Sequence, residues 1–412
     1  MFARAEVGSS VADPTVHPGE ADAAVDPPGL LDGLRASLAA LDEAGLRRRR
    51  RVVDSACGPE CVVDGRPVVA FCSNDYLGLA NAPELVAAAR EAAGRWGVGS
   101  GASHLVSGHL RPHEEAERAL AAHVRFPAAL TFSTGYMANL AIVTALVGRG
   151  DAVFADRLDH ASLVDAARLS QAEHVRYPHG DATALAVLLE KSAARRKLIL
   201  TDAVFSMDGD LAPLQRLVEL ADRHDAWLVV DDAHGFGVLG ERGRGTLAHL
   251  GIARSPRVVL MGTLGKAAGV AGAFVAAEQS VIDWLVTTAR TYIYTTAPSP
   301  AVAATATASV SLVAAADDRR RHLFGLVALL RAGLAGTRWT VPVSETPIQP
   351  LIVGDNREAL RLAEALLARG LWVPAIRPPT VPRGTARLRV TLSAAHGEAH
   401  VTRLVETLRA LQ

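Results

Sequence analysis

The chain has 412 residues, of which 50% are hydrophobic and 21% are charged, and its 43 Lys and Arg residues balance its 43 Asp and Glu residues. This composition is typical of a soluble globular protein and excludes a largely disordered chain or one with a strongly basic nucleic-acid-binding surface. We expect two or three domains, or one large α/β unit with a smaller partner.

The cysteines and the apolar segments indicate the cellular compartment. Cys57, Cys61 and Cys72 form an odd, clustered set, unlike the disulfide framework of a secreted protein, so a cytoplasmic protein is expected. Cys57 and Cys61 lack the further Cys or His residues that would complete a zinc site, and we expect no metal. The best membrane candidate, Ala301–Ala316, is shorter than the roughly 20 residues of a span, so no membrane partner is expected.

The N-terminal part predicts an extension followed by a helix and a hairpin. Residues 1–30 mix Pro, Gly, Ser and acidic residues without apolar periodicity and are expected to be disordered. From Leu31 to Leu46 leucines recur at helical spacing, and the basic run Arg47–Arg51 follows. Asp64-Gly65 between two β-rich runs indicates a hairpin. We assign residues 31–80 to this N-terminal segment.

The middle of the chain, residues 81–299, predicts a large domain. Helical patterns alternate there with short, continuous apolar runs, which is the signature of a mainly parallel sheet covered on both faces. The runs are Ala152–Ala155, Lys197–Leu200, Trp227–Val230, Val258–Met261 and Gly272–Ala276. Ligands of such sheets bind at the carboxyl ends of the strands, so the residues after each run are the candidates for function.

Residues 300–412 predict a smaller α+β domain. A long Ala-rich helix comes first, and shorter strand and helix patterns follow it. These patterns are Trp339–Val343, Ile348–Val353, Arg357–Arg369, Trp372–Val373 and Leu388–Leu392.

Lysine is rare in this chain, and one lysine has an unusual position. Lys191 and Lys197 lie in a charged segment, whereas Lys266 follows the run Val258–Met261 in a Gly-rich, apolar turn. Because arginine supplies nearly all of the other positive charges, a lysine here indicates a need for an amine that can lose its proton. The turn does not match a Walker phosphate loop, since Ala267 replaces the required hydroxyl residue.

A second polar cluster, Asp231-Asp232-Ala233-His234, follows the run Trp227–Val230. These side chains could bind a metal, act as a general acid and base, or pair with a pyridinium nitrogen. Lys266 favours the last option, because pyridoxal phosphate (PLP) requires a lysine, an acidic partner for its ring and a helix N-terminus for its phosphate. Phe132–Asn139 offers such a helix start, and His160 follows another strand. The residues therefore favour a PLP enzyme of the aspartate-aminotransferase-like fold type I.

Several motifs together resemble the α-oxoamine synthase family, over residues from about 31 to the C-terminus. They are Ser73–Leu79, Gly97–Gly101, Val204–Asp210, Val230–Gly235, Gly240–Gly245 and Gly265-Lys266. The resemblance implies a homodimeric, PLP-dependent acyltransferase that condenses an amino acid with an acyl thioester and releases carbon dioxide.

The resemblance also implies roles for individual residues at the cofactor. Lys266 would hold PLP covalently and then remove the α-proton, Asp231 would pair with the ring nitrogen, and His160 would stack on the ring. Ser206 and His234 would bond near the phenolic oxygen. The phosphate would be held by Gly135, Tyr136 and Thr263, with Thr295 or Thr296 of a neighbouring subunit.

Further positions would contact the substrate. Arg389 would bind the amino-acid carboxylate, a task suited to its planar fork, and Arg47 and Thr380 match substrate-contact positions, as does His160. The runs Ile348–Asp355 and Ala375–Pro382 resemble the family members that use L-alanine and a pimeloyl thioester, carried by coenzyme A or an acyl-carrier protein, in biotin synthesis.

The sequence departs from the family pattern in two places. Asp202 stands where family members often have Glu, and Ser103–Leu105 interrupts a stretch that is usually Gly-rich. The shorter acid could shift a hydrogen bond in the cofactor pocket, but neither change removes a catalytic group.

Three alternatives remain open. Another α-oxoamine synthase, such as glycine C-acetyltransferase, 5-aminolevulinate synthase or an enzyme that joins serine to a long acyl chain, would share the cofactor residues. A non-catalytic subunit of a heterodimer would be expected to lack Lys266. A metal hydrolase built on Asp231, Asp232 and His234 would leave Lys266 unexplained.

Overall fold

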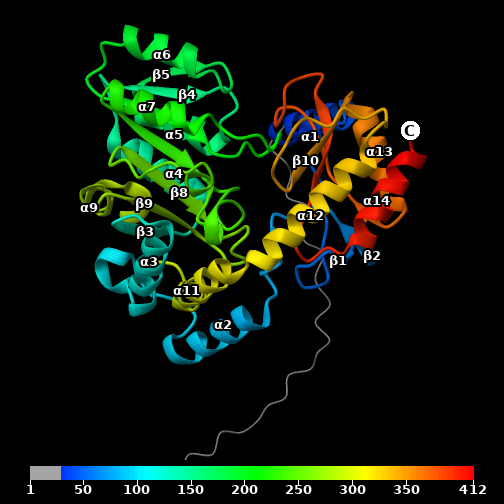
Figure 1. Cartoon of the computed structure of the whole chain (residues 1–412), viewed down its shortest axis with the longest axis horizontal. Coiled ribbons are helices and arrows are strands. Elements are labelled where there is room, and N and C mark those ends of the chain that lie inside the picture. Colours follow the sequence, from blue (N-terminus) through cyan, green and yellow to red (C-terminus); the bar gives the residue numbers. More distant parts are fainter. Residues whose placement is uncertain (1–28) are drawn as a thin grey trace, which may run out of the picture. The chain divides into compact units, whose positions relative to one another are not determined.

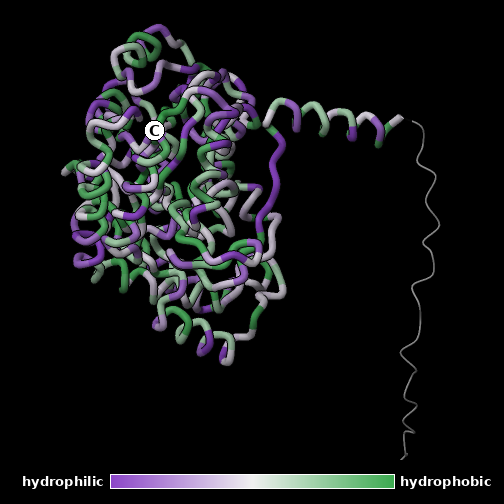
Figure 2. Tube along the Cα trace, turned by 90° about the vertical axis from the view of Figure 1, so that its right-hand side faces the viewer, coloured by the Kyte–Doolittle hydropathy of each residue, from purple (hydrophilic) through white to green (hydrophobic). Residues whose placement is uncertain are grey.

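The computed structural model describes residues 29–412, so most of the extension 1–30 that was expected to be disordered lies outside the described residues, whereas Leu30 already begins a helix. The chain divides into two units, residues 1–49 and 50–412. In the first unit, the predicted helix is α1 (Leu30–Glu43), and Figure 2 shows hydrophobic and hydrophilic residues alternating along it. The backbone turns at Gly45 and continues without regular structure into the arginine run.

The largest sheet of the second unit has seven strands, and Figure 1 shows helices on either side of it. In spatial order its strands are β3 (Ala128–Phe132), β9 (Ala273–Ala277), β8 (Val258–Thr263), β7 (Ala226–Asp231), β6 (Lys197–Asp202), β4 (Ala152–Asp156) and β5 (Glu173–Tyr177). Strands β8, β7, β6, β4 and β5 pair in parallel, as predicted. Strand β9, the predicted run Gly272–Ala276, instead runs antiparallel to β8 and β3. The link from β8 to β9 is shorter than the dozen residues that a parallel crossover needs.

Both faces of this sheet are buried against other elements. Because successive residues of each strand point to opposite sides, each strand contributes side chains to two cores. In β7, Val229 joins one core while Leu228 and Val230 join the other. The first core contains residues of α4 (Gly135–Leu146), α5 (Ala161–Ser170), α9 (Gln279–Thr288) and α10 (Arg290–Ile293). The second contains residues of α2 (Pro83–Trp96), α3 (Arg111–Val124), α6 (Ala182–Lys191), α7 (Leu214–Arg223) and α11 (Pro300–Ala315).

The C-terminal strands belong to two small, three-stranded sheets. The elements of this region are α12 (Asp317–Leu334), β10 (Ile348–Gly354), α13 (Asn356–Ala368), β11 (Leu371–Trp372), β12 (Ala375–Ile376), β13 (Ala386–Thr391) and α14 (Glu398–Ala410). Strands β10, β13 and β12 pair antiparallel. The expected strand at Trp339–Val343 is wrong, since only Thr340 there makes a β-bridge, to Ile352.

The predicted hairpin is confirmed as β1 (Glu60–Val63) and β2 (Arg66–Ala70). Strand β11 adds to it in parallel, with Leu371 opposite Val69, so segments about 300 residues apart in the chain share one sheet. The division into domains at residues 81, 299 and 300 stays a prediction.

Among the described residues, no single helix has the length and apolar composition of a membrane span, although α11 and α12, bent by 66° at their junction, meet both criteria as a pair.

Candidate active site

A cavity of about 200 Å³ lies at the carboxyl ends of the parallel strands. Strands β6, β7 and β8 end there in Asp202, Asp231 and Thr263. The cavity is lined by Gly135, Tyr136, Asn139, His160, Ser162, Asp202, Ser206, Asp231, Ala233, His234, Met261, Thr263 and Lys266. The structure therefore brings together the predicted residues Lys266, Asp231, His160, His234, Ser206, Gly135, Tyr136 and Thr263.

Lys266 begins a chain of hydrogen bonds that leads away from the cavity. Its Nζ lies 2.8 Å from Nε2 of His234, and Nδ1 of His234 lies 2.6 Å from the hydroxyl of Tyr76. The Tyr76 hydroxyl in turn donates to Oδ1 of Asn74 at 3.3 Å. This order is consistent when the Lys266 amine donates to Nε2 and Nδ1–H of a neutral His234 donates to Tyr76.

Burial shifts both ends of the Lys266–His234 contact toward the neutral state. It lowers the pKa of Lys266 to about 8, although the nearby carboxylates of Asp231 and Asp202 act in the opposite direction. Burial also lowers the pKa of His234 well below its usual value, and the positive charges of Lys266 and Arg389 lower it further. An amine with such a pKa can exchange its proton near neutral pH.

Asp231 is connected to His160 by a second chain of hydrogen bonds. Asn139 donates from Nδ2 to Asp231 Oδ2 at 2.8 Å and to Ser162 Oγ at 2.9 Å. Ser162 Oγ then lies 2.7 Å from Nδ1 of His160, and the Ser162 backbone N–H also points to that nitrogen. Nδ1 is therefore an acceptor, which fixes the imidazole orientation and places the proton of the neutral ring on Nε2.

Asp202 and Asp159 form a buried acidic pair behind His160. Asp202 Oδ2 accepts the backbone N–H of His160 at 3.1 Å, and Asp159 Oδ1 accepts the backbone N–H of Asp202 at 3.1 Å. Burial raises the pKa of both carboxyls well above the usual value, and the charges of neighbouring aspartates add to the rise. Asp202, the departure from the family pattern, thus holds the backbone of the predicted stacking residue.

The N-terminus of α4 faces the same cavity. Thr134 caps this helix by accepting the backbone N–H of Met137 at 3.2 Å. The first backbone N–H groups of a helix lack partners within it and favour an anion, so Gly135 and Tyr136 offer a place for a phosphate. Thr263 lines the same cavity. Its Oγ1 donates to Gly272 O at 3.1 Å and accepts from Gly265 N at 3.3 Å, and these bonds stabilise the turn that carries Lys266.

Arg389 reaches toward this region from β13. Its side chain is buried, and it donates from Nε to Ser206 O at 2.6 Å and from Nη1 to Asn74 Oδ1 at 3.2 Å. Among residues 29–412, no carboxylate forms an ion pair with this guanidinium. A buried guanidinium without an internal counter-ion suits a carboxylate ligand.

Besides Arg389, four predicted residues do not line the cavity. Thr295 and Thr296 lie in the turn after α10, and Thr380 is an exposed residue after β12. Arg47 belongs to the first unit, where it pairs with Asp42 and lowers the pKa of that carboxyl. The roles assigned to these four residues, like those of the residues at the cavity, stay predictions.

Asp232 differs from its neighbour Asp231. Its carboxylate accepts the backbone N–H of Thr246 at 2.8 Å and the Thr246 hydroxyl at 2.5 Å, and it does not line the cavity. Because successive residues at a strand end face opposite sides, Asp232 points away from the cavity that Asp231 and His234 line. This arrangement removes the basis for the metal-hydrolase alternative.

Sequence reasoning missed Asn139, Ser162 and Tyr76 as site residues. Ser162 follows His160 at the start of α5, and Asn139 lies one turn into α4, so each lies near a predicted residue in the chain. Tyr76 is completely buried and far from His234 in sequence, and only the fold brings them together.

The donor set of the cavity fits PLP. A single cavity offers a readily deprotonated amine on Lys266, a carboxylate on Asp231 for the ring nitrogen and a helix N-terminus for the phosphate. His160, with its ring orientation fixed, lies on the same cavity and is available for stacking.

Comparisons with known proteins agree with this fit. Residues 66–408 match the family "Aminotransferase class I and II". The 8-amino-7-oxononanoate synthase of Herminiimonas arsenicoxydans is 63% identical over 92% of this chain and 99% of its own length.

Solved structures give the same result. A serine palmitoyltransferase from S. paucimobilis with a bound PLP–myriocin aldimine is 32% identical, with a TM-score of 0.87 over 92% of this chain and 96% of that one. The 8-amino-7-oxononanoate synthase of Francisella tularensis is 30% identical, with a TM-score of 0.73 over 84% of this chain and 97% of that one. The expected fold type I and PLP dependence are thereby confirmed. The chain belongs to the aminotransferase class I and II family of PLP enzymes and, among its α-oxoamine synthases, to the 8-amino-7-oxononanoate synthase family.

Proposed function

We propose that this protein condenses L-alanine with a pimeloyl thioester to give 8-amino-7-oxononanoate, carbon dioxide and a free thiol, as a step of biotin synthesis. The observation that carries the chemistry is the half-buried Lys266 amine, which lies 2.8 Å from a neutral His234 on the same cavity as Asp231. The choice of substrates is supported by the name of the 63% identical relative, compared with 32% identity to a serine palmitoyltransferase.

Bound PLP would supply an electron sink for the carbanion that forms at the α-carbon of the amino acid. Asp231 would face the ring nitrogen and keep it protonated, while Asn139 holds that carboxylate in place. His160 would stack on the ring and limit its tilt. Gly135, Tyr136 and Thr263 would hold the phosphate at the N-terminus of α4.

Lys266 would remove the α-proton of alanine, because its amine is neutral in part near pH 8. His234 would keep the Lys266 amine directed at the reacting carbon and, together with Ser206, would bond near the phenolic oxygen of the cofactor. Arg389 would bind the alanine carboxylate, with its guanidinium oriented by Ser206 and Asn74.

The assembly and the compartment belong to the same proposal. A homodimer would allow Thr295 or Thr296 of a second copy to complete the phosphate site, which accounts for their absence from the cavity of one copy. Arg47 and Thr380 would contact the acyl donor, carried by coenzyme A or an acyl-carrier protein. The odd, clustered cysteines, all free, support a cytoplasmic location.

A product assay tests this proposal. Purified, PLP-loaded protein is incubated with L-alanine, glycine or L-serine, each combined with pimeloyl-, acetyl-, succinyl- or palmitoyl-CoA, and products are identified by mass spectrometry. We expect 8-amino-7-oxononanoate from alanine and pimeloyl-CoA. Preferred turnover of another pair would overturn the substrate assignment but not the role of Lys266, and a matching series with acyl-carrier protein identifies the carrier.

A further inference from the structure

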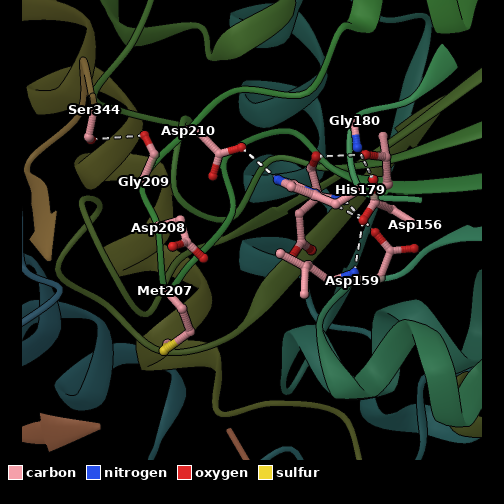
Figure 3. Close-up of polar contacts among 12 residues, drawn as sticks. Asp156, Asp159, His179, Gly180, Met207, Asp208, Gly209, Asp210 and Ser344 are labelled. Carbon is pink, nitrogen blue, oxygen red and sulfur yellow. Dashed lines mark hydrogen bonds and ion pairs between the residues drawn. The ribbon is translucent and has the colours of Figure 1, made fainter. Parts of the chain in front are cut away.

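His179 lies just beyond β5 and bridges two acidic residues (Figure 3). Its Nδ1 lies 3.0 Å from Asp156 Oδ1, and its Nε2 lies 2.9 Å from Asp210 Oδ2. A ring that donates from both nitrogens is an imidazolium. The bond to Asp156, followed by the bond to Asp210, raises the pKa of His179 to about 10.

The first partner, Asp156, ends β4 and starts the turn that leads to His160. Its carboxylate is buried and also accepts the backbone N–H groups of Leu158 and Gly180, each at 2.8 Å. The imidazolium is thus joined to the base of the turn from Asp156 to His160, which we call the stacking turn.

The second partner, Asp210, closes the loop Phe205–Asp210, which contains Ser206 and which we call the serine loop. Phe205 N donates to Asp210 O at 3.0 Å, and the Phe205 ring packs edge-on against the His179 ring, with their centres 4.3 Å apart. Asp210 Oδ1 is buried without a partner among the described residues, so the bond to His179 is what orients this carboxylate.

The serine loop also receives contacts from the C-terminal elements. Arg387 Nη1 donates to Met207 O at 3.1 Å and forms an ion pair with Asp208. Ser344 Oγ donates to Gly209 O at 2.9 Å (Figure 3). The loop is therefore held from β13 and the segment before β10 on one side, and by His179 on the other.

We propose that His179 is a positioning residue, whose bonds to Asp156 and Asp210 fix the stacking turn and the serine loop relative to each other and so place His160 and Ser206 at the cofactor. The proposed function is needed only for the turnover measured below. Cofactor binding and backbone protection test the inference independently of the substrate.

The main test compares His179→Gln with His174→Gln, a matched control within β5, the strand that precedes His179. His174 is half-buried, and its Nε2 is buried without a hydrogen-bond partner in the described part of the chain. In the apoenzyme we expect His179→Gln to speed amide hydrogen exchange in the stacking turn and serine loop by about tenfold or more, with β7 unchanged. His174→Gln should show the amide exchange rates of the wild type in the stacking turn, the serine loop and β7.

The same pair is then loaded with PLP. We expect the dissociation constant of PLP to rise for His179→Gln, and kcat with alanine and pimeloyl-CoA to fall by as much as about 10²-fold, the cost of a misplaced catalytic group. Unchanged exchange and PLP affinity would overturn the proposal, as would faster exchange across the whole sheet, since that indicates a structural role only.

Asp210→Asn is the second test variant, for use if His179→Gln does not fold. It keeps an acceptor oxygen for His179 but removes one charge, so we expect faster exchange in the serine loop and normal exchange in the stacking turn. Equal exchange in both segments would contradict the proposal. If the wild type makes no product from alanine and pimeloyl-CoA while His179→Gln still binds PLP more weakly, the proposed function fails and the positioning role stands.

Discussion

His234 and His179 lie beyond the carboxyl ends of strands in the same sheet, but their surroundings give them opposite charge states. His234 contacts Lys266 and lies near Arg389, so burial and nearby positive charge lower its pKa. His179 contacts Asp156 and Asp210, which raise its pKa to about 10. Charge thus separates a region adapted to proton exchange, around His234, from a region of closed ion pairs, around His179.

The strongest test of the region around His234 removes the amine of Lys266. Lys266→Ala should lower turnover by at least ~10²–10⁴-fold, the usual contribution of a positioned base, and should abolish the visible absorbance of lysine-linked PLP. Lys191→Ala, at the exposed end of α6, is the control and should behave like the wild type. Near-normal turnover of Lys266→Ala would refute the assignment of the base.

The adjacent aspartates allow a sharper comparison. Asp231→Asn removes the carboxylate at the cavity and should reduce turnover by roughly 10- to 150-fold, since hydrogen bonds to charged groups contribute about 1.5–3 kcal/mol. Asp232→Asn weakens the bonds to Thr246 and should instead lower the free energy of unfolding by about 1–3 kcal/mol. Kinetics and denaturant unfolding of both variants would show whether the two roles are separate; equal loss of turnover would show that they are not.

The proposed carboxylate site gives a smaller effect. Arg389→Lys keeps the charge but loses the planar fork, so the KM for alanine should rise roughly tenfold or more, with a smaller change in the KM for the acyl donor. Arg369→Lys, at an exposed arginine after α13, is the matched control. A change confined to the acyl donor would assign Arg389 to the other substrate.

The smallest effect concerns the pH dependence of stability in the apoenzyme. The pKa of Lys266 is about 8 when folded and near 10.5 when unfolded, so between these values the unfolded chain binds more protons and stability rises with pH. Lys266→Met removes this dependence. The variant should be the more stable protein at pH 7, and its advantage should shrink between pH 8 and 10.5 in urea unfolding; a constant difference would mean that the folded-state pKa is not lowered.

The sequence was informative wherever the signal was local. Parallel strands follow from continuous apolar runs, and Lys266 was found because a lysine in a Gly-rich turn is unusual in an arginine-rich chain. The direction of β9 also follows from a local signal, because the link after Thr263 is too short for a parallel crossover.

Other features depend on contacts between distant residues. The hydrogen-bond chain from Asp231 through Asn139 to Ser162 joins three elements. Tyr76 contacts His234 although 158 residues separate them in the sequence. No local pattern distinguishes Asp231 from Asp232 either, because the difference lies in Thr246, which the fold places beside only one of them.

The hairpin-like link between β8 and β9 has a consequence for the reacting amine. Lys266 is tethered at both ends to paired strands, and Thr263 Oγ1 bridges the start and the end of the link. Its backbone therefore has little freedom to swing away, and the side chain alone can move. With PLP bound, an amine held in this way would stay near the reacting carbon at a high effective molarity, where Lys266 would be able to take up a proton and to bind the cofactor again.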